Sequence, residues 1–147
     1  MTDDSIGMMD KAYFVGKQVL IQWLNELLNL RITKIEECAT AAVYCGVMDC
    51  LFPGTFQYSR VKWGAKHEHE FVENYKILQG SFDKNGVKRH IDVAKLIKAR
   101  YQDNLEFCQW LKAFFDKHYN GEPYDGLGRR KGQDLYYIGI GGKIGST

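Results

Sequence analysis

The chain has 147 residues, of which 45% are hydrophobic and 26% are charged, as is usual for a globular domain with one core. No apolar run approaches the roughly 20 residues that a membrane-spanning helix needs. The acidic start, Met1-Thr2-Asp3-Asp4, does not resemble a secretory signal, so we expect a cytoplasmic protein with no membrane partner. Residues 1–58 carry 4 Lys or Arg against 7 Asp or Glu, whereas residues 59–147 carry 16 against 11, which predicts one basic face.

The first half of the chain predicts two helices. A helix from about Val15 to Leu28 carries a stripe at helical spacing, formed by Leu20, Trp23, Leu24, Leu27 and Leu28. Thr33 and Glu36 then have the spacing of a capping box. They are expected to begin a second helix at Ile35, and Pro53-Gly54 is expected to end it. Small residues along this helix favour a central position in the core.

Three further helices are predicted in the second half. One runs from about His67 to Phe82 and is followed by Asn85-Gly86, while Asp92 is expected to cap a helix of one or two turns. The closing helix, Asp103 to about Tyr119, is expected to begin with Asp103 as its cap. The Glu106 side chain is expected to accept a hydrogen bond from the backbone N–H of Asp103. Its apolar stripe consists of Phe107, Cys108, Leu111, Phe114 and Phe115. No segment alternates with period two, so the sequence predicts an all-α fold, a compact helical bundle.

The end of the chain differs in composition. Residues 121–147 contain eight of the 15 glycines, which makes a single packed conformation costly. We therefore expect a Gly-rich tail that is mostly flexible, with Tyr136-Tyr137-Ile138 as the stretch able to dock. The predicted organisation is an N-terminal extension at residues 1–12, a folded domain at 13–120 and this tail. The absence of a heptad repeat predicts a monomeric fragment.

The sequence shows no recognisable pattern for catalysis or metal binding. Cys38, Cys45, Cys50 and Cys108 form no C-x-x-C pair and are expected to be buried free thiols. His67 and His69 are two positions apart, so they point in different directions on a helix. Gly139-Ile140-Gly141-Gly142 lacks the strand–turn–helix context of a phosphate loop. We expect no catalytic residues, no metal, no cofactor and no enzyme activity.

Eight sequence blocks carry a family resemblance. They are Gly7-Met8-Met9-Asp10-Lys11-Ala12-Tyr13-Phe14-Val15-Gly16, Gln22-Trp23-Leu24-Asn25, Leu30-Arg31-Ile32-Thr33-Lys34-Ile35-Glu36, Met48-Asp49-Cys50-Leu51-Phe52-Pro53-Gly54, Val61-Lys62-Trp63, His69-Glu70-Phe71, Asn74-Tyr75-Lys76-Ile77-Leu78-Gln79 and Tyr101-Gln102-Asp103-Asn104-Leu105-Glu106-Phe107. In this order they resemble the calponin-homology domain of end-binding proteins, which track microtubule plus ends. The resemblance covers about residues 8 to 125.

The resemblance implies a calponin-homology domain that docks a basic face on the tubulin lattice and senses its nucleotide state. It places the protein on the microtubule cytoskeleton, at plus ends and on the spindle during cell division. Gln102 is expected to contribute to nucleotide-state discrimination while the cations supply attraction. Carried over residue by residue, the expected contact set is Lys17, Arg60, Lys66, Lys76, Arg89, Gln102 and Lys112.

The chain also departs from the family pattern. Ser59 and Ala113 stand where relatives often carry a second basic residue, so the basic face is thinner. The family's linker, dimeric coiled coil and acidic-aromatic C-terminus do not occur in this sequence. The complete protein is expected to be dimeric through such a coiled coil. The main alternative is an actin-binding or scaffold calponin-homology domain, followed by a nucleic-acid binder, for which no recognised motif is present.

Overall fold

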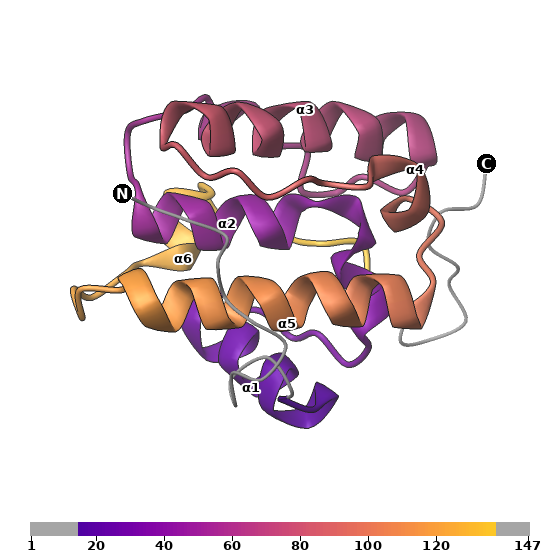
Figure 1. Ribbon diagram of the computed structural model, residues 1–147, viewed down its shortest axis with the longest axis horizontal. Coiled ribbons are helices and arrows are strands. Elements are labelled where there is room, and N and C mark those ends of the chain that lie inside the picture. The colour runs from indigo at the N-terminus through magenta and orange to yellow at the C-terminus, as the bar shows by residue number, and fades with distance from the viewer. Residues whose placement is uncertain (1–14, 138–147) are drawn as a thin grey trace.

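The computed structural model describes residues 15–137, and every regular element among them is a helix. The predicted all-α fold is therefore confirmed for this part of the chain. In Figure 1, α2 lies between α3 and α5, and it contacts both of them as well as α1. The elements, with η marking a 3-10 helix, are α1 (Lys17–Leu28), η2 (Ile35–Thr40), α2 (Ala42–Leu51), η3 (Tyr58–Arg60), α3 (Glu68–Lys84), α4 (Val93–Leu96), α5 (Tyr101–His118) and α6 (Gly126–Arg129).

Helix α1 follows the prediction closely. Its stripe packs into the core with three fully buried leucines and two half-buried residues, namely Leu20, Leu24, Leu28, Trp23 and Leu27. The helix ends at Asn29, whose left-handed backbone (φ 56°) turns the chain. Asn25 holds that turn, because its side chain bonds both the N–H and the carbonyl of Ile32, at 2.7 and 3.0 Å.

The prediction of a single helix between Ile35 and Pro53 is wrong, because the segment forms two helices. The chain breaks at Ala41, where φ is 70°, so that η2 ends before α2 begins. Polar partners stabilise the break: Thr40 Oγ1 accepts the N–H of Ala42 at 3.2 Å, and Asn74 Nδ2 donates to the Thr40 carbonyl at 2.9 Å. Because Asn74 comes from α3, hydrophobic periodicity along this segment gives no sign of the break.

The capping residue of η2 is Glu37, not the predicted Glu36. Glu37 Oε1 accepts the backbone N–H of Thr33 at 2.9 Å and that of Lys34 at 3.2 Å. Lys34, not Thr33, occupies the N-cap position. The side chain that bonds the N-cap N–H therefore belongs to Glu37, three residues after Lys34. The predicted chemistry is present, but its register differs by one residue.

The two middle helices are close to the prediction. The inner face of α3 is buried through Phe71, Tyr75, Leu78 and Phe82. Asp92 caps α4, since its Oδ1 accepts the N–H of Lys95 at 3.4 Å. The connector between these helices runs back along α3 before reaching α4 (Figure 1). That path places residues 85–92 between α3 and α5.

Helix α5 begins at Tyr101, two residues before the predicted cap Asp103. Asn104 accounts for the early start, because its Nδ2 bonds the carbonyls of Leu96 at 3.2 Å and Arg100 at 3.1 Å. Asp103 therefore lies in the first turn, where the helix dipole favours its charge. The predicted stripe is confirmed, and no member of it is more than 5% exposed: Phe107, Cys108, Leu111, Phe114 and Phe115.

Most residues between 121 and 137 are exposed, but a few of their side chains join this segment to the helical core. Residues 138–147 lie outside the described residues, so the mostly flexible tail expected for 121–147 stays a prediction. In Figure 1 the segment 121–137 (yellow) passes behind α2. Asp49 of α2 is fully buried and accepts Arg129 Nε at 2.8 Å, Arg129 Nη2 at 2.7 Å and the Tyr124 hydroxyl at 2.6 Å. The hydrogen bonds to Asp49 hold the pKa of Arg129 above its usual range.

A second anchor joins this segment to the end of α1. Arg130 is 3% exposed, and its guanidinium donates to the carbonyls of Leu28 and Asn29. Gly126 permits the close approach, since a Cβ at that position would lie 2.6 Å from the Leu28 carbonyl oxygen. One of the glycines that predicted mobility is therefore required for packing.

Thiol reactivity offers a test of the packed core. Cys38, Cys45 and Cys108 are fully buried, whereas Cys50 is half-buried, and burial raises the pKa of its thiol to about 11. Because the thiolate is the reacting form, we expect Cys50 in the folded chain to react with Ellman's reagent at neutral pH at least ~10-fold more slowly than free cysteine. Unfolding should release all four thiols. A fast-reacting thiol in the folded chain would contradict this expectation.

Candidate functional site

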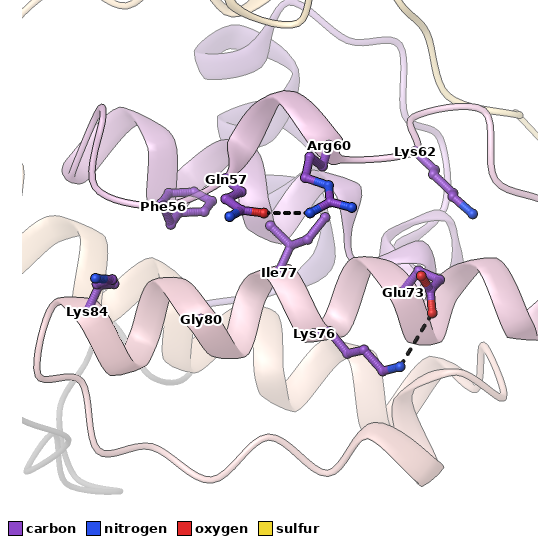
Figure 2. A pocket seen from close by; sticks show the side chains of 9 residues that line it. All are labelled: Phe56, Gln57, Arg60, Lys62, Glu73, Lys76, Ile77, Gly80 and Lys84. Carbon is purple, nitrogen blue, oxygen red and sulfur yellow. Dashed lines mark hydrogen bonds and ion pairs between the residues drawn. The ribbon is translucent and has the colours of Figure 1, made fainter.

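Arg60 and Lys76 line one groove, of about 450 Å³, between η3 and α3. Figure 2 shows Arg60 and Lys62 on the η3 side, with Lys76 and Lys84 on α3. Arg60 Nη1 donates to Gln57 Oε1 at 2.9 Å, and Lys76 Nζ lies 3.4 Å from Glu73 Oε2. The complete lining is Phe56, Gln57, Arg60, Lys62, Glu73, Lys76, Ile77, Gly80 and Lys84.

The η3 side of this groove is fixed to α3 by one buried amide. Asn74 Oδ1 accepts the N–H of Lys62 at 2.8 Å, and Asn74 Nδ2 donates to the Lys62 carbonyl at 3.0 Å. Tyr58 and Val61 are also buried beneath the same loop. The exposed cations therefore project from a backbone that is held in place, which lowers the entropy lost when a partner binds.

Two groove cations, Lys62 and Lys84, do not belong to the contact set expected from the sequence. Lys84 could have been found, because positions 76, 80 and 84 share one face of a helix. Lys62 could not have been found, because its position beside α3 depends on the two hydrogen bonds between the Asn74 side chain and the Lys62 backbone.

A second group of predicted residues gathers where the connector meets α5. Arg89 and Glu106 line one hollow, and Gln102 Nε2 donates to Glu106 Oε2 at 3.0 Å. Lys17 reaches the same end of α5 from α1, with its Nζ 6.0 Å from the ring centre of Tyr101. Arg89 and Gln102 thus both lie beside Glu106, whereas Lys17 lies near Tyr101 in the first turn of α5.

Arg89 has a packing role as well as a charge. Its guanidinium lies over the ring of Trp110, 5.3 Å from the centroid, a favourable cation–π arrangement. Its Nε is buried without a hydrogen-bond acceptor among residues 15–137. A substitution at Arg89 would therefore alter the core as well as the surface, so it is a poor test of binding.

Lys66 and Lys112 lie against other neighbours. Lys66 Nζ is 5.0 Å from the ring centre of Tyr136. The backbone N–H of Lys66 donates to Glu70 Oε1 at 2.9 Å, and this bond is the main reason that the pKa of Glu70 is lowered. The side chain of Lys112 is only 17% exposed, and its Nζ lies 2.7 and 2.8 Å from the two oxygens of Asp116. Its charge is therefore largely satisfied within α5, and it is the weakest member of the predicted set.

Between residues 15 and 137, no group of three His, Cys, Asp or Glu side chains is placed to hold a metal. The expectation that His67 and His69 point in different directions is wrong: their rings stack with centres 5.8 Å apart, because His67 is the extended N-cap of α3 and lies outside the helix. No helix in this range combines the length and apolar character needed to cross a bilayer.

Comparison with known proteins supports the resemblance seen in the sequence. The family model of the calponin homology (CH) domain matches residues 15–120. The "Microtubule-associated protein RP/EB family member 1C" of Arabidopsis thaliana is 45% identical over 128 residues, which are 86% of this chain and 39% of the relative. The chain therefore spans well under half the length of that curated relative.

A solved structure gives the same result for the fold. It comes from work on the "Structural Basis of Microtubule Plus End Tracking by XMAP215, CLIP-170 and EB1" and shares 46% sequence identity with this chain. The match has a TM-score of 0.77 and covers 80% of this chain and 100% of the solved one. The predicted resemblance to end-binding calponin-homology domains is confirmed.

Proposed function

This chain belongs to the calponin homology domain family, and from that premise we propose that it binds the microtubule lattice through its basic side chains. The observation that carries the proposal is the similarity, 45% and 46% identity, to a microtubule-associated relative and to a structure from work on plus-end tracking. The contact set we propose remains Lys17, Arg60, Lys66, Lys76, Arg89, Gln102 and Lys112.

The electrostatics of the chain suit an acidic polymer. Arg60, Lys66 and Lys76 are exposed, and an acidic lattice would attract them and orient the encounter. Individual exposed ion pairs contribute only about 0.2–1 kcal/mol, so several must act together. Binding should therefore weaken as salt screens the charges.

Co-sedimentation tests the proposal. We expect the chain to pellet with microtubules grown in a slowly hydrolysed GTP analogue, and to pellet less with GDP microtubules. Actin filaments and duplex DNA at equal mass provide the comparison for the two alternative classes. Pelleting with actin or DNA but not with microtubules would contradict the proposed function. In a cell, this binding would place the chain on cytoplasmic microtubules, with enrichment at plus ends and on the spindle.

Gln102 provides a test of nucleotide sensing. Its amide is oriented by the bond to Glu106, so it can respond to lattice geometry through directional hydrogen bonds that a point charge lacks. We expect Gln102→Ala to reduce the preference for GTP-like over GDP lattices at least ~3-fold, equivalent to less than one typical hydrogen bond. Affinity for GDP lattices should change little. Binding curves on the two lattices measure this ratio.

The matched control for Gln102 is Gln22 on α1. Gln22 makes the same kind of bond, from its Nε2 to Glu26 Oε2 four residues along, at 3.1 Å. Gln22→Ala should leave the lattice preference unchanged. If both variants shift the preference equally, or neither does, Gln102 has no special part in discrimination.

A further inference from the structure

We infer that the groove between η3 and α3 receives an extended acidic segment of the lattice that inserts an apolar side chain between the flanking cations. This inference rests on the proposed function and adds the chemistry of the partner at one site. A flat basic surface would need only ion pairs, whereas the lining of this groove also includes Phe56 on the η3 side and Ile77 on α3 (Figure 2).

The charge of the groove favours an acidic occupant. Four cations line it, two on each side, against the single carboxylate of Glu73. Glu73 is matched with Lys76 at 3.4 Å. No ion pair within residues 15–137 involves Arg60, Lys62 or Lys84. These three charges are therefore available to carboxylates of a partner, and their two-sided placement fits a chain that passes between them.

The floor of the groove favours an apolar side chain in that segment. Phe56 and Ile77 are only half-buried and line the same groove as the cations. Gly80 leaves the floor open, because a Cβ built there would meet nothing within 4 Å. A small oxyanion would leave this apolar surface in contact with water. Covering it adds binding energy that does not depend on salt, as expected at the centre of an interface.

Filling the groove tests the inference without changing its charge. Gly80→Leu places a side chain over the floor, and replacing glycine inside a helix favours folding. Gly64→Leu is the matched control, since a Cβ at Gly64 also meets nothing within 4 Å and Gly64 does not line the groove. The probe is a fluorescein-labelled peptide with one phenylalanine between two runs of three glutamates. Thermal unfolding of each variant confirms that it folds.

We expect the unsubstituted chain to bind this peptide, and Gly80→Leu to weaken the Kd at least ~10-fold, or about 1.4 kcal/mol. Gly64→Leu should bind as the unsubstituted chain does. Replacing the peptide's phenylalanine with alanine should weaken binding, and the loss should persist at high salt. Inorganic phosphate should not compete at matched ionic strength. Equal peptide binding by the two glycine variants would overturn the inference, as would equal binding of the phenylalanine and alanine peptides.

Microtubule pelleting by the same proteins separates this inference from the proposed function. A loss of pelleting by Gly80→Leu but not by Gly64→Leu supports the groove as a lattice contact. Normal pelleting by Gly80→Leu overturns the groove while leaving microtubule binding intact. If the unsubstituted chain binds the peptide but does not pellet, the lattice is ruled out as the source of the acidic segment and the proposed function fails.

Discussion

Reversing two charges in the groove, Arg60→Glu with Lys76→Glu, is expected to weaken microtubule binding at least ~10-fold at low salt. Each reversal removes an attraction of about 0.2–1 kcal/mol and adds a repulsion of similar size, so the two together approach or exceed the 1.4 kcal/mol of a tenfold change. Both side chains are exposed, and within residues 15–137 their polar contacts are with Gln57 and Glu73. The fold should therefore be unaffected.

The control for this variant carries the same change in net charge elsewhere. Lys117→Glu with Lys131→Glu alters two exposed lysines that do not belong to the proposed contact set. Co-sedimentation across a series of salt concentrations should give this control a binding curve close to that of the unsubstituted chain. Equal losses in both double variants would mean that only net charge matters, which would contradict a defined docking surface.

Arg129→Ala is expected to lower the free energy of unfolding by about 2–3 kcal/mol. Among residues 15–137, its removal leaves the fully buried carboxylate of Asp49 with the Tyr124 hydroxyl as its one side-chain donor. Stranding one partner of a buried ion pair costs about 3–5 kcal/mol. We expect less here because the Arg129 side chain is 46% exposed, which lets water approach. Denaturant unfolding followed by tryptophan fluorescence measures the change.

Two further variants show whether the buried charge is the cause. Asp49→Asn in the Arg129→Ala background removes the stranded charge and should recover part of the lost stability. Arg31→Ala breaks an arginine–aspartate pair of similar length, 2.8 Å to Asp134, but its side chain is 77% exposed, so little stability should be lost. Similar losses for Arg31→Ala and Arg129→Ala would mean that burial of Asp49 is not responsible.

The long helices could be predicted because their signals are local. Leu20, Leu24 and Leu28 have the spacing of one helix face, and the Phe107 to Phe115 stripe does so as well. Both are buried as expected. The break at Ala41 could not be predicted, since its partner Asn74 lies on α3. The contact between Arg129 and Asp49 could not be predicted for the same reason, since the two residues are 80 positions apart.

The contact set stays a prediction, and the arrangement of its members could not be read from the sequence. Exposure of Arg60 and Lys76 follows from their polar settings, but their shared groove requires η3 and α3 to meet. The stacking of Arg89 on Trp110 likewise depends on the path of the connector. In contrast, the pairing of Lys112 with Asp116 has the i, i+4 spacing of a helical ion pair. That neutralisation could have been read from the sequence.

The most direct test of a docking basic face is lysine footprinting on and off the microtubule. The chain is acetylated briefly in each state, and mass spectrometry gives the modification rate at every lysine. Binding through the proposed face should protect Lys17, Lys66 and Lys76, together with the groove lysines Lys62 and Lys84, while Lys117 and Lys131 react as before. Protection of Lys117 and Lys131 with continued reaction at Lys66 and Lys76 would contradict the account.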